Sequence, residues 1–317
     1  MGKLNLRSFC LTCWVIAMAD QASKLREIFA KNDKGSGEDP DEAGEKAYDR
    51  SRIISVASGK GGVGKTNLVV NIGLALQKSG KEILILDADM GMANVDVLLG
   101  LTSRYHLGHV LKQKCELEDA LINGPEGITV LPGASGIDQF IDINMAQIEN
   151  LLELSASIEK NYDFILMDIG AGAHKGVVNF IRAADEIMII LTPEPTAVMD
   201  AYSLLKILSN YEVSSRLNLI INQVESKKEA KGVTERMGSA IEEYLDMELD
   251  VSSYVPHDSF LPKAVRKQKP VMELYPNSRS GKAFSRIARN LLDEASQDSS
   301  RGMKGFVYRM LGFFKED

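Results

Sequence analysis

From Arg52 onward, short apolar runs alternate along the chain with longer segments that have helical spacing. The runs are apolar throughout rather than at every second position, which is typical of parallel strands covered on both faces. They predict strands at Ile53–Ala57, Ile83–Asp87, Ile128–Leu131, Phe164–Asp168, Ile187–Leu191, Leu217–Ile221 and Val251–Val255. Helices are predicted at Asn67–Ser79, Met145–Glu159, Thr196–Ser209, Gly232–Leu245 and near Ser278–Glu294. We therefore expect residues 52–296 to form an α/β domain, with a doubly wound, mostly parallel sheet and helices on both faces.

The N-terminal part of the chain departs from this pattern. Asp20–Lys31 predicts a helix whose apolar residues share one face, namely Ala22, Leu25, Ile28 and Phe29. So short a helix does not fold alone, so we expect it to dock on this protein or on another one. Residues 32–51 contain seven carboxylates between Asp33 and Asp49, together with glycine and proline, and predict a flexible acidic linker.

The C-terminal part also departs from it. A polar linker at residues 297–302 leads into a segment at 303–317 that is apolar along one side of a helical wheel. The apolar residues are Met303, Phe306, Val307, Met310, Leu311, Phe313 and Phe314, and Lys304, Arg309 and Lys315 flank them. We expect Met303–Lys315 to lie in the plane of an anionic membrane surface, since it is too short to span a bilayer. The alternative is that this stripe packs on the domain's own surface, and in a monomer both can hold.

A glycine-rich loop lies between the first predicted strand and the first predicted helix. Residues 58–66 read SGKGGVGKT, which contains the phosphate-binding frame Gly59-x-x-x-x-Gly64-Lys65-Thr66. In such a loop the backbone N–H groups turn toward an anion, the lysine reaches the outer phosphates, and the threonine hydroxyl binds Mg²⁺. The predicted nucleotide contacts are Gly59, Lys60, Gly61, Gly62, Val63, Gly64, Lys65, Thr66 and Asn67.

Three carboxylates follow predicted strands at the edge where this loop must lie. Asp168 ends one strand, in the position of a Walker B aspartate, and Asp87 and Asp89 stand at the end of the predicted strand Ile83–Asp87. Carboxylates beside a polyphosphate are costly unless a cation is present, so we predict a Mg²⁺ site made by Thr66, Asp87 and Asp168. Gly170 would sense the terminal phosphate. The alternative is that these carboxylates only cap turns.

The loop carries one lysine more than phosphate binding needs. The run Lys60-Gly61-Gly62-Val63-Gly64-Lys65-Thr66 resembles the deviant Walker A loop of the MinD/ParA family of dimerising ATPases. This resemblance implies that Lys60 reaches the nucleotide of a partner subunit, so that ATP binding and dimerisation are one event. It also implies slow hydrolysis that acts as a timer.

Further segments resemble the MinD branch. The run LDADMGMANVDVLLGL is similar to its switch I, which implies that Asp89 orients the attacking water and that Asn94 and Asp96 lie along the dimer face. Asn222 matches the residue that reads adenine, and the loop Val255–Asp258 matches the one that closes over the base through Pro256 and Asp258. The chain has no Asn-Lys-x-Asp guanine signature, which favours ATP over GTP.

Two further segments narrow the resemblance to one family within this branch. Asp20-Gln21-Ala22-x-x-Leu25-Arg26 resembles the DQAxxLR motif of FlhG (also called FleN or YlxH), and Thr192–Tyr202 is similar to the same family. The resemblance implies control of flagellar number and placement, and stimulation of FlhF, an SRP-type GTPase, through the helix at Asp20–Lys31. The chain departs from the family at Ile169, where a small polar residue is common, and at His174, which we interpret as a surface or interface residue.

Two other ATPase classes remain alternatives. A MinD-type division-site ATPase would lack the tethered DQAxxLR helix. A ParA-type partition ATPase would need a basic surface for DNA and no membrane helix. A third interpretation, an antagonist of a transcription factor, would be an additional activity of the same family.

Composition limits the class of protein, its partners and its cellular compartment. The 317 residues are 44% hydrophobic and 26% charged, as in an ordinary soluble globular protein. The net charge of −7 argues against wholesale nucleic-acid binding but leaves room for a local patch, and we expect no specific nucleic-acid partner. Three cysteines, Cys10, Cys13 and Cys115, cannot form a secreted disulfide framework. We therefore expect a cytoplasmic protein at the inner face of the cell membrane. Residues 1–19 imitate a signal peptide, and we interpret this segment as a start-site extension in which residues 1–17 precede Met18, the true start.

Overall fold

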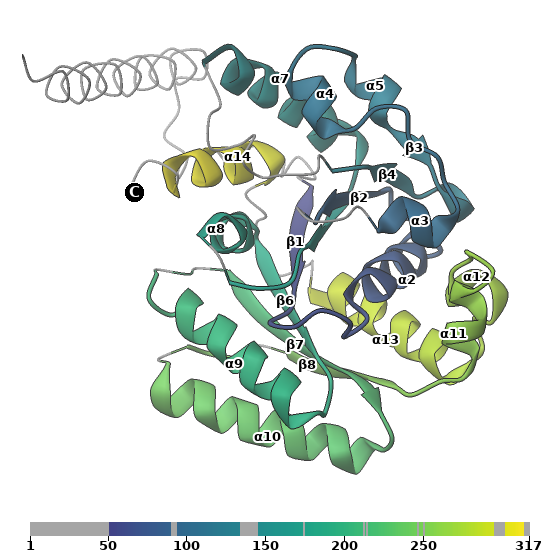
Figure 1. The fold of residues 1–317 in the computed structure, drawn as a ribbon, viewed down its shortest axis with the longest axis vertical. Coiled ribbons are helices and arrows are strands. Elements are labelled where there is room, and N and C mark those ends of the chain that lie inside the picture. Colours follow the sequence, from purple (N-terminus) through teal and green to yellow (C-terminus); the bar gives the residue numbers. More distant parts are fainter. Residues whose placement is uncertain are drawn as a thin grey trace, which may run out of the picture. The chain divides into compact units, whose positions relative to one another are not determined.

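A computed structural model describes residues 51–89, 94–133, 145–173, 175–211, 213, 215–245, 247–249, 251–294 and 302–313. These residues form an eight-stranded sheet in the order β3-β4-β2-β5-β1-β6-β7-β8 (Figure 1). The strands are β1 Arg52–Ala57, β2 Ile83–Ala88, β3 Ile122–Asn123, β4 Thr129–Leu131, β5 Phe164–Ile169, β6 Glu186–Leu191, β7 Arg216–Val224 and β8 Val251–Pro256. Neighbouring strands are parallel except β3, which runs antiparallel to β4. The predicted mostly parallel sheet is confirmed, and only the two-residue strand β3 was missed.

Helices cover both faces of the sheet, as predicted. On one face of β1, Ile54 and Val56 belong to a buried cluster with Leu68 of α2 and Phe284 of α13. On the other face, the Ser55 hydroxyl donates to the carbonyl of Ile181 in α8, 3.3 Å away. The helices are α2 Lys65–Gln77, α3 Val95–Leu99, α4 Leu107–Leu111, α5 Leu117–Ala120, η1 (3₁₀) Pro125–Gly127, α7 Met145–Asn161, α8 Lys175–Ala183, α9 Pro195–Leu208, α10 Lys227–Tyr244, α11 Phe260–Val265, α12 Val271–Leu274, α13 Arg279–Glu294 and α14 Gly302–Phe313.

The strand order places its topological switch point beside the glycine-rich loop. The connection that follows β1 leads through α2 to β2, whereas the one that follows β5 leads through α8 to β6 on the opposite side of β1. Since β1 and β5 are neighbours, the loops at their carboxyl ends diverge, and this is where open α/β sheets bind ligands. The β2–β5 pairing sets Asp87 directly opposite Asp168 at the same edge.

The helix expected at Met303–Lys315 spans Gly302–Phe313 and packs on α7 and α8 (Figure 1). Its side chains Met303, Phe306, Val307 and Met310 are buried, and the rings of Phe306 and Phe180 lie 6.2 Å apart. The second sequence interpretation, packing on the domain's own surface, is therefore the arrangement seen here. Among the described residues, none of the helices combines the length and apolarity needed to cross a bilayer.

The predictions for residues 1–19 and 20–31 lie outside the described residues, as do those for the linkers 32–51 and 297–302 except at their last residues. Outside the described residues they stay predictions. Ser51 is buried and Gly302 begins α14, so at these two positions the linker predictions were wrong.

Candidate nucleotide-binding site

The loop between β1 and α2 has the backbone of an anion-binding loop. Gly62 and Gly64 have φ angles of 80° and 90°, in the left-handed region that favours glycine. A Cβ added at Gly61 or Gly62 would meet nothing within 4 Å, so the outer side of the loop is open to a ligand. A Cβ at Gly59 would lie 2.2 Å from the Asp200 carbonyl group, so this glycine lets the loop approach α9 closely.

Lys65 and Asp168 form a buried ion pair beneath this loop. The Lys65 ammonium donates to Asp168 Oδ1 at 2.7 Å, and the two side chains are 9% and 0% exposed. The second oxygen of the same carboxylate, Oδ2, is buried and has no hydrogen-bond partner. A buried carboxylate oxygen without a partner costs free energy, so this atom fits a Mg²⁺ ion or one of its water ligands. Thr66, the next residue on α2, supplies a hydroxyl on the same helical turn.

Asp87 accepts three backbone hydrogen bonds from the segment that follows β2. Its Oδ1 accepts from the Asp89 N–H at 3.0 Å, and its Oδ2 accepts from the N–H groups of Asn94 and Val95 at 2.9 and 3.1 Å. Burial, aided by the charge of Asp168, raises the pKa of Asp87 from 3.8 to about 6, against these three hydrogen bonds. A bound cation would favour the ionised form of this carboxylate.

Asp89 and Gly170 lie side by side at the ends of β2 and β5. A Cβ added at Gly170 would lie 3.0 Å from Asp89 Oδ1. The residue predicted to orient water and the residue predicted to sense the terminal phosphate therefore share one location, although their roles stay predictions. Ile169, between Asp168 and Gly170, is fully buried and extends β5, and His174 lies outside the described residues.

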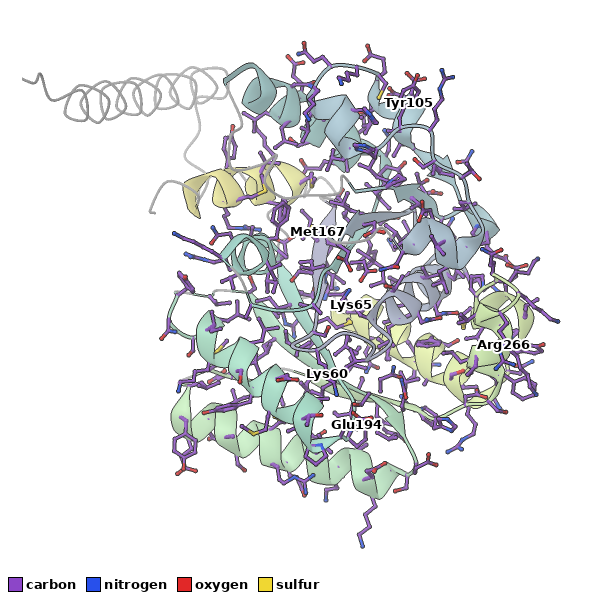
Figure 2. The ribbon with its side chains drawn as sticks, in the orientation of Figure 1. Lys60, Lys65, Tyr105, Met167, Glu194 and Arg266 are labelled. Carbon is purple, nitrogen blue, oxygen red and sulfur yellow. The ribbon has the colours of Figure 1, made fainter. Side chains whose placement is uncertain are left out.

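Lys60 contacts its own subunit at the rim of the loop. Its ammonium lies 3.3 Å from Glu194 Oε2 and donates to Thr196 Oγ1 at 3.0 Å. The side chains of Lys60 and Glu194 are 41% and 66% exposed, and Figure 2 shows the two close together at the start of α9. Glu194 and Thr196 were missed as site residues, because the segment Thr192–Tyr202 was singled out only for its family likeness.

The residues predicted to contact the base also hold parts of the fold together. Asn222 Nδ2 donates to the Val63 carbonyl at 2.7 Å and so attaches the end of β7 to the phosphate loop. Asp258 accepts from the N–H and the hydroxyl of Ser280, both at 2.8 Å, and from the Phe260 N–H at 3.0 Å. Burial alone would raise its pKa, but these hydrogen bonds outweigh it and lower the pKa to about 2. Base contacts by Asn222, Pro256 and Asp258 stay predictions.

The short helix α3 connects the switch I region to the turn between α11 and α12. Its N-terminus is held by Asp87, and its Val97 carbonyl accepts from Gln268 Nε2 at 3.0 Å. Gln268 has a left-handed φ of 52°, which is uncommon for a residue with a side chain. No motif marks Gln268 in the sequence. Asn94 precedes α3, and the side chain of Asp96 accepts from the Val97 N–H, so their dimer contacts remain predictions.

Comparisons with known proteins agree with this geometry. A family model described as an AAA domain matches residues 51–221. Antiactivator FleN of Pseudomonas aeruginosa is 37% identical over 82% of this chain and 93% of its own length. Flagellum site-determining protein YlxH of Helicobacter pylori is 30% identical over 83% of this chain and 90% of its own length. Among solved structures, septum site-determining protein MinD of Pyrococcus horikoshii, complexed with Mg-ADP, is 26% identical with a TM-score of 0.63, covering 79% of this chain and 99% of that one.

Proposed function

Because the chain belongs to the FleN/YlxH family of MinD/ParA-type P-loop ATPases, we propose that it is an ATP-driven switch that regulates the number and placement of flagella. ATP and Mg²⁺ would turn it from a monomer into a dimer. The observation that carries the proposal is the Lys65–Asp168 pair with its orphaned carboxylate oxygen beneath an open glycine loop.

The chain's own groups would be sufficient for ATP hydrolysis. Lys65 would leave Asp168 to neutralise the outer phosphates, and Thr66, Asp87 and Asp168 would hold Mg²⁺. When bound, that ion neutralises charge that develops on the phosphoryl oxygens. Asp89 would orient the attacking water next to Gly170. Nothing further is required of the protein, because phosphoryl transfer is catalysed mainly by positioning and charge.

Lys60 would connect hydrolysis to pairing. Its present partners are exposed, and exposed ion pairs stabilise by only about 0–1 kcal/mol. A phosphate of the nucleotide bound to a second subunit could therefore compete for Lys60. A dimer would then contain two nucleotides, each touched by the Lys60 of the other subunit.

Lys60→Ala tests the pairing directly. We expect the variant to bind a fluorescent ATP analogue within about threefold of the wild-type affinity, since Lys65 and the loop are intact. In light scattering with a non-hydrolysable ATP analogue and Mg²⁺, it should stay monomeric where the wild type dimerises. Lys231→Ala is the matched control, since Lys231 lies on α10 and pairs only with Glu235 among the recorded ion pairs. A Lys60→Ala protein that dimerises like the wild type would contradict the proposal.

The N-terminal motif supports a GTPase partner. DQAxxLR at residues 20–26 is the sequence feature that carries this part of the proposal. Deleting Asp20–Lys31 should abolish stimulation of an FlhF-type GTPase while leaving intrinsic ATP hydrolysis unchanged. Equal stimulation by the deleted and full-length chains, measured as phosphate release, would refute it.

The C-terminal helix α14 supports regulated membrane binding. Four apolar side chains of α14 are buried against the domain, namely Met303, Phe306, Val307 and Met310. Fully burying one such side chain stabilises by about 1.5–3 kcal/mol, so moving α14 from the domain into water is unfavourable. An anionic bilayer interface offers a comparable apolar environment and also attracts its flanking cations. Two such helices on one dimer would bind with avidity, which a monomer lacks.

The contact between α14 and the domain includes one ion pair that can be weakened without altering α14. Arg309 donates to the Ala183 carbonyl at 2.7 Å and to Asp185 Oδ1 at 3.0 Å. Asp185→Asn keeps the shape but removes the charge, so α14 should leave the domain more readily. We expect at least about a threefold to fivefold gain in pelleting with anionic liposomes in the absence of ATP, because this pair is largely buried and losing its charge costs about 1 kcal/mol or more. Unchanged pelleting would show that this ion pair does not restrain α14.

A further inference from the structure

Helices α11 and α12 are attached to two separate sides of the candidate nucleotide site. The Phe260 N–H, at the start of α11, donates at 3.0 Å to Asp258, a residue predicted to contact the base. On α12, the Met272 N–H donates to Asn71 Oδ1 of α2, and the Met272 carbonyl accepts from Lys78 Nζ just beyond α2, both at 2.9 Å. Since α2 follows the phosphate loop directly, the two helices connect the base side of the site to the phosphate side.

The turn between α11 and α12 contacts a third part of the site, the short helix α3. Gln268 Nε2 donates to the Val97 carbonyl at 3.0 Å. A Cβ added at Gly100, which ends α3 in a left-handed conformation, would lie 3.3 Å from Gln268 Cβ. Among the recorded hydrogen bonds of the described residues, no other joins α3 to α11 or α12. Figure 1 shows α3 and α12 both beside α2, so Gln268 connects two helices that pack on a common neighbour.

The other end of α3 is held by Asp87. Its carboxylate accepts from the N–H groups of Asn94 and Val95, at 2.9 and 3.1 Å. A helix of this length spans about 7.5 Å and does not persist without such contacts. The contacts at its two ends therefore fix the position of α3, and a shift at the Gln268 end would move the N–H groups that orient Asp87.

We propose that α11 and α12 couple the base side of the site to its Mg²⁺ side, with Gln268 as the positioning residue that sets α3 and, through it, Asp87. This inference rests on the proposed ATPase function and adds a regulation of the same site. A base that fixes the loop at Val255–Asp258 would also fix the start of α11, so α3 would be held more firmly. A ligand that carries phosphates without a base would lack this effect, because coupling requires contacts on both sides.

The chain contains a matched control for Gln268. Gln113 also follows a short helix, and the two glutamines have left-handed φ angles of 51° and 52°. In both turns the glutamine N–H donates at 2.9 Å to the carbonyl three residues earlier, Val110 or Val265. The side chain of Gln113 is exposed and makes no recorded hydrogen bond among the described residues. Replacing each glutamine by methionine keeps the length of the side chain and removes its N–H donor.

Hydrogen exchange of α3 without nucleotide tests the contact itself. The amides of Leu98 and Leu101 donate to the carbonyls of Asn94 and Asp96, so their exchange reports on opening of α3. In Gln268→Met these amides should exchange about threefold to tenfold faster than in the wild type, since one hydrogen bond to α3 is lost. In Gln113→Met they should stay within about twofold of the wild type, as expected for an exposed side chain without a partner.

The coupling is tested by repeating the measurement with saturating Mg-ADP and with saturating Mg-pyrophosphate. Neither ligand has the terminal phosphate, so pairing of subunits does not mask α3. In the wild type and in Gln113→Met, ADP should slow the exchange of α3 at least about threefold more than pyrophosphate does. In Gln268→Met the two ligands should protect α3 equally. In steady-state hydrolysis, kcat of Gln268→Met should fall about threefold to tenfold with KM for ATP within about twofold of the wild type, because the phosphate loop is intact.

Three results would overturn the inference. One is that Gln268→Met leaves the exchange of α3 unchanged, and another is that ADP and pyrophosphate protect α3 equally in the wild type. The third is that both methionine variants lose kcat equally, which would indicate general destabilisation. If the wild type binds and hydrolyses ATP while one of these results is obtained, the coupling alone is wrong. If the wild type binds neither ADP nor ATP in equilibrium dialysis, the proposed function fails and the coupling fails with it.

Discussion

Two lysines of one short loop occupy opposite environments. Lys65 is buried under the loop against a carboxylate that is 0% exposed, whereas Lys60 lies at the rim against a carboxylate that is 66% exposed. A buried pair is costly to break, because it leaves an uncompensated charge away from water, while an exposed pair contributes almost nothing. The inner lysine therefore belongs to an ion pair that is already formed at the site where we propose that the nucleotide binds. The outer lysine is held weakly enough to change partners.

Replacing Lys65 should have the largest effect. In Lys65→Ala, the outer phosphates lose their cation and Asp168 is left buried without a partner. We expect ATP hydrolysis to fall at least about 100-fold, since a lost charge clamp costs several kcal/mol at the transition state. The free energy of unfolding in urea should also fall by up to about 3 kcal/mol.

Lys60→Ala is the matched control for the stability measurement. It should leave the free energy of unfolding within about 0.5 kcal/mol of the wild type, because its contacts are exposed. If the two substitutions reduced stability equally, the contrast between a preformed inner site and a loosely held outer lysine would be wrong.

The second prediction concerns Asp87, whose pKa in the folded chain is about 6 against an ordinary value of 3.8. Folding therefore favours the protonated carboxyl, so its contribution to stability is complete below pH 3.8 and is lost as the pH rises through 6. This loss amounts to about 2 kcal/mol between pH 4.5 and pH 7.5. Urea unfolding in the presence of EDTA measures it.

Asp87→Asn isolates this contribution from those of other titrating groups. The free energy of unfolding of the variant, minus that of the wild type, should be about 2 kcal/mol larger at pH 7.5 than at pH 4.5, because only the wild type loses this stability as the pH rises. A difference that does not change with pH would mean that burial beside Asp168 does not perturb Asp87. The inner site would then be less strained than the structure indicates.

Much of the fold could be predicted because parallel strands leave a strong pattern. Continuous apolar runs placed β1, β5 and β6 within a residue or two of their observed ends. The antiparallel strand β3 has two residues, Ile122 and Asn123, and so short a segment carries no periodicity. The extended end of β7, at Asn222–Val224, includes a register shift against β8, which depends on pairing rather than on local sequence.

Within the site, local motifs could be predicted and long-range partners could not. The glycines, Lys65 and the strand-end aspartates are recognisable because their spacing along the chain is fixed by the chemistry of a phosphate loop. Glu194 and Gln268 lie 134 and 171 residues from the groups they contact, Lys60 and Val97. Nothing local distinguishes them from other exposed polar residues. Likewise, the apolar stripe of α14 was visible in the sequence, but the surface that covers it was not.

The smallest predicted effect comes from Glu194→Ala, which removes one of the two partners of Lys60. If this contact restrains Lys60 before pairing, its loss should tighten the ATP-dependent dimer by about twofold to fivefold, in keeping with an exposed ion pair. Sedimentation with a non-hydrolysable ATP analogue measures the dimer dissociation constant, and Glu235→Ala, which breaks the exposed pair with Lys231, is the control. A weaker dimer in Glu194→Ala would mean that Glu194 stays with Lys60 across the interface. In that case the exposed contact with Glu194 would orient Lys60 toward the partner subunit. Burial would then not distinguish the contacts of this loop that matter for function from those that do not.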